Sequence, residues 1–328
     1  MIKALSLKGV ILMLKQTPRM IAPSNRPLGM RISKALARYW PLYLMMVPGM
    51  LFFFIYKYLP FTGLTIAFRD FAIRGTISES PWYGFYWFER FWNSATAWQI
   101  IENTLIISLS KIVIGMVPPL IFALAINECG FKRYARFIQT VSYLPHFLSW
   151  IIVFGIATTM FNEGSGVINR LIVNLGGSPV PFLTSNKYAR GMLVVTDLWH
   201  SIGWSSIVYL AAIMGIDTAM YEAARIDGCS RFGQIWYITL PNLGRIFVVL
   251  LITKVGNILD GGFNQVHVFT NERINASIDI IDTWVYNQGL GKMQYELATA
   301  VGLMKSVISA IMVLGTNALA RKWDSALW

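Results

Sequence analysis

The sequence predicts an all-α integral membrane protein, and three observations carry this prediction. Hydrophobic residues make up 55% of the 328 residues, and charged residues only 13%. The mean hydropathy is +0.52, and several windows approach the roughly 20 apolar residues that a helix needs to cross a bilayer. No glycine- and serine-rich linker or short repeat marks off a large soluble domain. One membrane domain is therefore expected.

Six apolar windows predict six transmembrane helices. In chain order they lie at about residues 40–62, 100–127, 137–161, 190–215, 244–263 and 297–319. Lys254, Asn257 and Asp260 interrupt the fifth window. A helix is still expected there, because backbone groups inside a bilayer have to pair within the protein.

Prolines interrupt two of the windows. Pro118 and Pro119 lie in the second, and Pro145 lies in the third within SYLPHFLSW. A proline lacks a backbone donor and clashes with the carbonyl one turn earlier, so a kink is expected at both places.

Basic residues concentrate in alternate connections, which predicts the orientation of the chain. They gather in residues 1–39, in the second connection, in the fourth connection and at the C-terminus. Because Lys and Arg near helix ends favour the cytoplasmic side, these segments and both termini are expected in the cytoplasm. Residues 1–39 then form a basic cytoplasmic segment ahead of a membrane domain at 40–328. This bias explains most of the net charge of +12, so nucleic acid is not an expected partner.

The chain shows no pattern of a catalytic, cofactor-binding or metal-binding site. Cys129 and Cys229 are isolated, and Gly289-Leu290-Gly291-Lys292 lacks the first glycine and the Ser/Thr of a phosphate-binding loop. The three histidines are expected at different depths: His146, His200 and His267. We therefore expect no enzyme, no metal and no cofactor in this chain.

One connection, residues 217–241, is polar and helix-prone between two apolar windows. Asp217 or Thr218 can cap a short helix that runs through Arg225, and Gly228 can end it in the left-handed conformation. Ser230 can then cap a second helix that stops near Leu240, just before a proline. The pattern predicts a cytoplasmic helix-turn-helix.

The first of these two helices has a surface suited to docking. Ala223 and Ala224 are small enough to allow close approach, and Glu222 and Arg225 provide a charged rim. Composition alone supports an equal alternative, in which Glu222 and Arg225 pair across a turn of a solvated helix.

The spacing in this connection resembles a known signature. Glu222-Ala223-Ala224, three residues, Gly228, nine residues, Ile238 and then Leu240-Pro241 is similar to the EAA signature of permease subunits of binding-protein-dependent ABC importers. PGMLFFFIYKYLPFTGLTIAFRDF, SPWYGFYWFERF, SYLPHFLSW, IDTWVY and YELATAVGL resemble the polysaccharide and oligosaccharide branch of that family. The resemblance covers the chain from about residue 40 onward.

This resemblance implies an ABC importer permease (MetI/MalF-like) fold in the bacterial plasma (inner) membrane. It implies that the EAA helix couples to a cytoplasmic ATPase through Glu222, Ala223, Ala224, Arg225, Asp227 and Gly228. It further implies a second related permease, two ATPase subunits that bind ATP and Mg²⁺, and an extracytoplasmic solute-binding protein. The substrate would be an oligosaccharide, with acidic fragments of alginate or pectin as one option.

Polar residues inside membrane windows are candidates for the substrate pathway, because they are costly unless they face a bundle interior or a water-filled cavity. The candidates follow helical spacings: Asp197, His200, Trp204, Lys254, Asn257, Asp260 and Ser306. The alternative is interhelical packing, in which Asp197 or Asp260 neutralises one of three lysines: Lys111, Lys254 and Lys305.

Other classes of membrane protein explain less of the sequence. A secondary transporter or channel would not need the connection at 221–241, and a membrane enzyme would need clustered catalytic His, Asp or Glu. Amino-acid permeases carry a similar loop, but in shorter chains with different flanking segments.

Overall fold

The computed structural model describes residues 28–71 and 75–321. Residues 1–27 of the predicted basic segment, and Lys322, lie outside this part of the chain. The described chain is helical, apart from an isolated antiparallel bridge between Arg69 and Trp82. It separates into two compact units that divide between Thr62 and Gly63.

The first unit contains the first predicted membrane helix. Helix α2 (Leu28–Phe53) continues through a π-turn, η1 (Phe54–Tyr58), into the 3₁₀ segment η2 (Leu59–Phe68). The stretch Arg38–Phe68 is long and apolar enough to cross a membrane, and it includes the whole predicted window. Because α2 begins at Leu28, the predicted boundary after residue 39 falls inside a helix.

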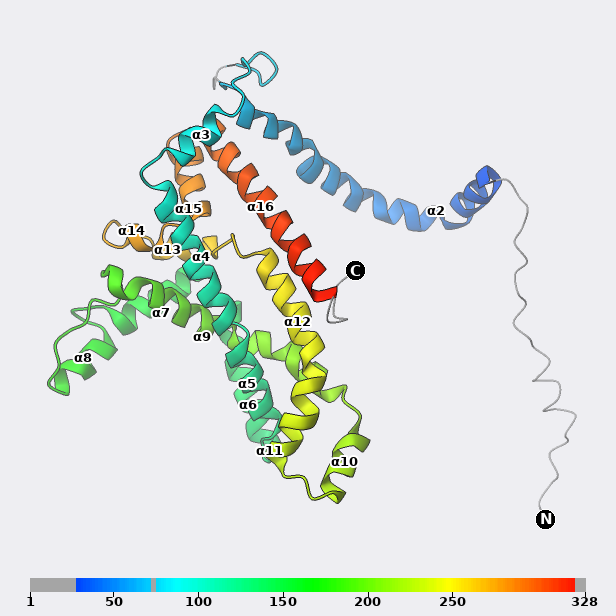
Figure 1. Ribbon diagram of the computed structural model, residues 1–328, viewed down its shortest axis with the longest axis vertical. Helices are drawn as coiled ribbons and strands as arrows, with labels where there is room; N and C mark the ends of the chain where they lie inside the picture. Colours follow the sequence, from blue (N-terminus) through cyan, green and yellow to red (C-terminus); the bar gives the residue numbers. More distant parts are fainter. Residues whose placement is uncertain (1–27, 72–74, 322–328) are drawn as a thin grey trace, which may run out of the picture. The chain divides into compact units, whose positions relative to one another are not determined.

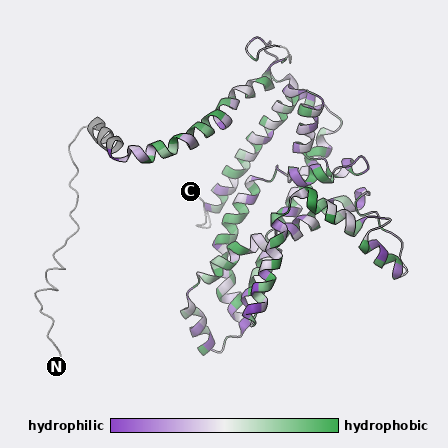
Figure 2. Ribbon diagram, turned by 180° about the vertical axis from the view of Figure 1, so that it is seen from behind, coloured by the Kyte–Doolittle hydropathy of each residue, from purple (hydrophilic) through white to green (hydrophobic). Residues whose placement is uncertain are grey.

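The second unit supplies the remaining candidate spans. Three of its helical stretches are long and apolar enough to cross a membrane: Ala97–Asn127, Arg231–Gly256 and Tyr295–Arg321. Two bent helix pairs are also long and apolar enough if each pair is counted as one span. The described residues therefore contain four candidate spans, or up to six. Figure 2 shows hydrophobic residues along the long helices and hydrophilic residues in the short helix α10 (Thr218–Ile226). The predicted all-α membrane fold is confirmed.

The second predicted span has the expected proline break. It consists of α4 (Ala97–Ile114) and α5 (Val117–Asn127), joined at Gly115 and Met116. Pro118 and Pro119 stand in the first turn of α5, where a missing backbone donor costs no helical hydrogen bond. The prolines therefore set where the helix restarts.

The third predicted span is not one helix, and this corrects the expectation for residues 137–161. Helix α6 (Lys132–Tyr143) passes into the 3₁₀ turn η3 (Leu144–Phe147), and α7 (Trp150–Phe161) then leaves at 109°. Pro145 stands in η3, and Leu148 is extended with φ −81° and ψ 140°. Ser149 caps the restart by accepting a hydrogen bond from the Ile152 amide. Proline and cap together produce a sharp bend where we expected a kink.

The fifth predicted span is also shorter than expected. Helix α12 (Leu240–Gly256) ends before Asn257, and the chain turns until α13 (Phe263–Phe269) begins. Gly261 and Gly262 have φ angles of +59° and +82°, which a continuous helix does not contain. The predicted helix over residues 244–263 was wrong beyond 256.

Helix α9 (Asn186–Met214) organises the second unit. It packs against α4, α5, α6, α7, α12, α13 and α14 (Asn275–Ile278). Figure 1 shows α12 beside α16 (Tyr295–Arg321), with α10 at one end of the unit and α3 (Tyr86–Trp92) and α15 (Ile281–Tyr286) at the other. The predicted coupling loop therefore lies at the opposite end of the unit from α3 and α15.

A buried polar network joins α4, α9 and the segment that leads into α15. The Arg190 guanidinium donates to Asn103 Oδ1 at 2.6 Å and to the Ser277 carbonyl at 2.9 Å. The Asn103 amide donates to the Ala276 and Asp279 carbonyls at 3.1 and 3.0 Å. Asn103 is fully buried, so it satisfies groups that have no access to water.

We expect Asn103→Ala to lower the free energy of unfolding by about 2–3 kcal/mol, because several buried polar groups lose their partner at once. Thermal unfolding of the purified protein in detergent measures this effect. Glu102→Ala, one residue earlier at an exposed position, is the matched control and should stay within about 0.5 kcal/mol. Equal effects of the two substitutions would contradict a structural role for the network.

Candidate functional site

Helix α10 carries the predicted coupling residues and begins as the sequence predicted. Asp217 is extended, with φ −61° and ψ 124°, and its carboxylate accepts a hydrogen bond of 2.9 Å from the Ala219 amide. This bond satisfies one of the amides that every helix start leaves free. The expected cap is confirmed at Asp217.

The end of α10 is also confirmed. Gly228 has a φ of +75°, and its amide donates to the Arg225 carbonyl at 3.1 Å. The next amide, of Cys229, donates to the Ala224 carbonyl at 2.8 Å. This pair of bonds is a Schellman motif, in which a residue with a side chain would be strained at the left-handed position. Gly228 therefore fixes where the helix turns away.

The segment after Gly228 differs from the expectation. Ser230 caps α11 (Arg231–Gln234), but that helix continues through a π-turn, η4 (Ile235–Thr239), directly into α12. The predicted stop near Leu240 was wrong. Pro241 lacks a donor and crowds the carbonyl one turn before it, and the wider π-turn lies at this place. A continuous stretch, Arg231–Gly256, therefore connects the loop to the membrane.

Helix α10 has no buried residue. Glu222, Ala223 and Arg225 are exposed, and Ile226 is 87% exposed. The Arg225 side chain donates to the Tyr221 carbonyl of its own helix at 3.2 Å, and no ion pair joins Glu222 to Arg225 among the described residues. The alternative of a paired, solvated turn is wrong in this respect.

One hydrogen bond ties this helix to the stretch that leads into the membrane. The Tyr221 hydroxyl lies 2.9 Å from Thr239 Oγ1. This bond links the position of α10 to η4 and hence to α12. In the turn after α10, the Gln234 side-chain amide donates to the Cys229 carbonyl at 3.1 Å. The coupling roles of the predicted residues remain predictions.

Four of the predicted pathway residues line one cavity, which we call the charged cavity. It has a volume of about 270 Å³ and lies among α4, α9, α12 and the turn after α12. The four are Asp197, Lys254, Asn257 and Asp260, and Lys111 lines the same space. The sequence singled out these four residues on separate predicted helices, and the fold brings them to one space. Their role in transport remains a prediction.

Lys111 holds the turn that ends α12. Its ammonium donates to the Gly261 carbonyl at 2.9 Å, and a Cβ on Gly262 would lie 2.6 Å from Lys111 Nζ. Only glycine fits that approach together with a φ of +82°. Unwound backbone at membrane depth needs such a partner, because its carbonyls are otherwise unpaired.

A second cation is neutralised at the edge of the charged cavity. Lys305 Nζ lies 2.5 Å from Asp282 Oδ1 and 3.9 Å from Asp260 Oδ1. Burial raises the pKa of the Asp282 carboxyl to about 6, and the Lys305 ammonium opposes this shift. The packing alternative, in which Asp197 or Asp260 neutralises a lysine, holds for Asp260 and Lys305, but Asp282 is the closer partner. Sequence reasoning missed Asp282 because it lies on α15, in a predicted outer connection.

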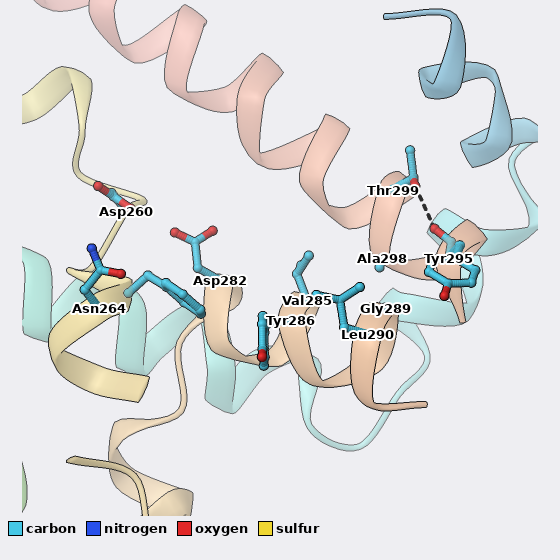
Figure 3. Close-up of a pocket in the computed structure, with 11 residues that line it drawn as sticks. Asp260, Asn264, Asp282, Val285, Tyr286, Gly289, Leu290, Tyr295, Ala298 and Thr299 are labelled. Carbon is cyan, nitrogen blue, oxygen red and sulfur yellow. Dashed lines mark hydrogen bonds between the residues drawn. The ribbon is translucent and has the colours of Figure 1, made fainter. Parts of the chain in front are cut away.

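A larger cavity, the aromatic cavity, adjoins the charged one. It has a volume of about 670 Å³. Figure 3 shows Asp260 and Asn264 on one side and Asp282, Tyr286 and Tyr295 along the other. Asp260 lines both cavities. The two spaces therefore meet at the turn after α12.

The other three predicted pathway residues line neither cavity. Trp204 stacks on His146 with ring centroids 4.5 Å apart, and His200 stacks on Trp150 at 4.4 Å. The ring centroids of His146 and His200 are 5.4 Å apart. The expectation that these two histidines lie at different depths was therefore wrong. Ser306 is exposed and donates to the Gly302 carbonyl of its own helix at 2.9 Å.

The aromatic cluster stabilises the bend between η3 and α7. His200 Nε2 lies 3.2 Å from the Leu148 carbonyl, which belongs to the extended residue at the bend. Packing therefore accounts for His200. Among the described residues, no group of three or more His, Cys, Asp or Glu side chains could hold a metal ion.

The comparisons with known proteins agree with this architecture. A family described as the binding-protein-dependent transport system inner membrane component matches residues 115–325. The chain belongs to this family. The match extends from the break between α4 and α5 beyond α16, and it includes α10.

Two relatives match this permease over most of its length. Protein LplB of Bacillus subtilis (strain 168) is 41% identical over 283 residues, covering 86% of this chain and 89% of LplB. The polygalacturonan/rhamnogalacturonan transport system permease protein YteP of the same strain is 38% identical over 282 residues, with 86% and 88% coverage. The predicted family is confirmed, and the permease is a multi-pass inner-membrane protein.

Solved structures show the same fold. A chain of a bacterial alginate ABC transporter, in complex with an alginate pentasaccharide-bound periplasmic protein, matches with a TM-score of 0.84 and 35% identity. That match covers 90% of this permease and 99% of the other chain. The permease is thus a transport component of a binding-protein-dependent ABC importer.

Proposed function

We propose that this permease forms half of the translocation pathway for oligosaccharides in an ATP-driven importer, and that α10 couples it to a cytoplasmic ATPase. The observation that carries the coupling assignment is the geometry of α10. A capped helix with no buried residue ends in a sharp glycine turn and exposes Glu222 and Ala223. A helix with this much free surface is suited to a groove on a partner, and a rigid helix transmits motion better than a flexible loop.

The partners follow from the same proposal. A second related permease would complete the pathway, two ATPase subunits would bind ATP and Mg²⁺, and an extracytoplasmic solute-binding protein would deliver substrate. This permease would bind no nucleotide itself. Both termini and α10 would lie in the cytoplasm, and α3 and α15, at the other end of the second unit (Figure 1), would face outward. An ATP-independent transporter or channel is not supported, because the chain belongs to a binding-protein-dependent family.

Cross-linking tests the coupling assignment. Ala223→Cys, in a background where Cys129 and Cys229 are replaced by serine, should cross-link to the ATPase subunit in the assembled complex. Gly176→Cys, in the turn after α8 (Val167–Asn174), is the matched control and should not cross-link. Failure at 223, or equal cross-linking at both positions, would overturn the docking of α10.

Oligosaccharides are the proposed substrates because one relative and one structural relative are named for saccharides. YteP is a polygalacturonan/rhamnogalacturonan permease, and the structural relative is an alginate transporter. Both names refer to acidic polysaccharides, and cations line the charged cavity. Calorimetric binding of neutral and uronic-acid oligosaccharides to the partner solute-binding protein tests this. Binding of neutral sugars alone would remove the acidic option and leave saccharide import standing.

A further inference from the structure

Three lysines of the membrane-spanning helices differ in what they contact. Lys111 lies on α4, Lys254 on α12 and Lys305 on α16. A cation at membrane depth is costly unless a counter-charge, a carbonyl or a water-filled space compensates it. The contacts of each ammonium therefore show which lysine is available to a ligand.

Two of the three lysines are already hydrogen-bonded to other groups of the protein. Lys305 is 2.5 Å and 2.6 Å from the two carboxylate oxygens of Asp282. Lys111 donates to the Gly261 carbonyl at 2.9 Å, and it packs against Gly262 of the same turn. Neither ammonium can bind a ligand without leaving its present partner, the Asp282 carboxylate or the Gly261 carbonyl, unpaired.

Lys254 is different. It lines the charged cavity, and among the described residues no carboxylate lies within 4.0 Å of its ammonium and no acceptor is hydrogen-bonded to it. Its Nζ lies over the break between α4 and α5, 3.1 Å from where a Cβ on Gly115 would stand. The residue as a whole is half-buried.

We infer that Lys254 selects substrates that carry a carboxylate, an inference that rests on the proposed function. An ammonium donates charge-assisted hydrogen bonds to a uronate carboxylate, and these are stronger than bonds to a hydroxyl. The Asp197 carboxylate lines the same cavity, and among the described residues it accepts no hydrogen bond and lies within 4.0 Å of no cation, so it can accept from sugar hydroxyls. Asp260 also faces the cavity, but it shares Lys305.

The size of the charged cavity suits this role. Its volume of about 270 Å³ is near the lower limit of pockets that bind small molecules, about 300 Å³. It therefore fits one sugar unit of a longer chain. The adjoining aromatic cavity, which shares Asp260 and contributes Tyr286 and Tyr295, offers apolar ring faces for the next unit.

Uptake by the reconstituted importer complex tests the inference. The probes are trigalacturonate and its fully methyl-esterified, neutral counterpart, each presented at a saturating concentration of the solute-binding protein. Lys254→Met should slow trigalacturonate uptake about tenfold or more, the size expected for the loss of one charged hydrogen bond. It should change uptake of the neutral ester less than twofold, and Lys254→Arg should restore at least half of the trigalacturonate rate.

Matched variants separate charge recognition from structural damage. Lys292→Met removes an exposed cation before α16 and should leave both rates unchanged. Lys111→Met removes the partner of Gly261 and should slow both probes equally. If wild-type takes up only trigalacturonate, the neutral ester gives no comparison, and the Lys254→Arg variant is decisive. A trigalacturonate rate of at least half the wild-type value supports the inference, and a lower rate overturns it.

Other outcomes overturn the inference while the proposed function stands. These are equal losses of both probes with Lys254→Met, no loss with that variant, and wild-type uptake of the neutral ester alone. If wild-type takes up neither saccharide, the inference fails, and galacturonate chains are removed from the proposed oligosaccharide substrates.

Discussion

Gly228→Pro is expected to abolish substrate-stimulated ATP hydrolysis by the assembled complex while the protein still inserts into the membrane. Gly228 has a φ of +75° and ends α10 in a Schellman motif. Proline fixes φ near −65° and has no amide to donate to the Arg225 carbonyl. The turn would therefore open, and Ala223 and Glu222 would lose their fixed position. Stimulated hydrolysis should fall at least about tenfold, equivalent to about 1.4 kcal/mol of lost coupling.

Gly176→Pro is the matched control for this variant. Gly176 is also left-handed, with a φ of +86°, and a Cβ there would meet nothing within 4 Å. It follows α8, outside the predicted coupling loop. The control should retain the ATPase subunits on co-purification, whereas Gly228→Pro should lose them. Normal stimulated turnover by Gly228→Pro, combined with Glu222→Lys, would contradict the coupling assignment.

Lys305→Met is expected to lower the free energy of unfolding by about 3 kcal/mol and to abolish transport. The substitution leaves the Asp282 carboxylate without its partner at 2.5 Å. Removing one member of a buried ion pair costs about 3–5 kcal/mol. The lower end applies here, because the two side chains are 20% and 21% exposed. Burial also raises the pKa of Asp282 to about 6, so a lone carboxyl can take up a proton. Thermal unfolding in detergent measures the change.

A double variant separates the pair from general damage to α16. Replacing both members, as Lys305→Met with Asp282→Leu, should recover stability to within about 1 kcal/mol of wild-type, since apolar substitution of a buried pair is often neutral. Ser309→Ala, one turn further along α16, should change stability by less than about 0.5 kcal/mol. If the double variant were less stable than the Lys305 single variant, the ion pair could not be the cause.

Local signals predicted the coupling loop in detail. Asp217, Gly228 and Ser230 occupy the capping positions that their side chains or backbone conformations favour. Such caps depend on residues within a few positions of one another, so the sequence alone defines them. The extent of the second helix was wrong, because a π-turn before Pro241 lets the helix continue where a stop was expected.

Helix breaks that depend on distant residues were not predictable in the same way. The turn at 257–262 forms where Lys111, from another helix, donates to the Gly261 carbonyl. The bend before α7 has its Leu148 carbonyl against His200 of α9. Apolar composition and the cost of unpaired backbone favour continuous helices in both windows. The helices break because a side chain from another helix contacts a carbonyl at each break.

The candidate site was predictable by residue type but not by pairing. Asp197, Lys254, Asn257 and Asp260 were selected because polar groups in apolar windows are unusual, and they do line one cavity. Asp282 was missed, because nothing in a polar connection distinguishes a carboxylate that pairs with a membrane lysine. Helical spacing grouped Asp260 with residues of α12, yet it lies on a turn, where that spacing has no meaning.

ATP-driven uptake in proteoliposomes tests the central claim most directly. The permease, its partner permease and the ATPase subunits are reconstituted, and radiolabelled trigalacturonate is added outside with the solute-binding protein. We expect accumulation against a gradient that requires ATP, requires the binding protein, and is lost with Gly228→Pro. Accumulation that proceeds without ATP or without the ATPase subunits would contradict the proposal that this permease is driven through α10.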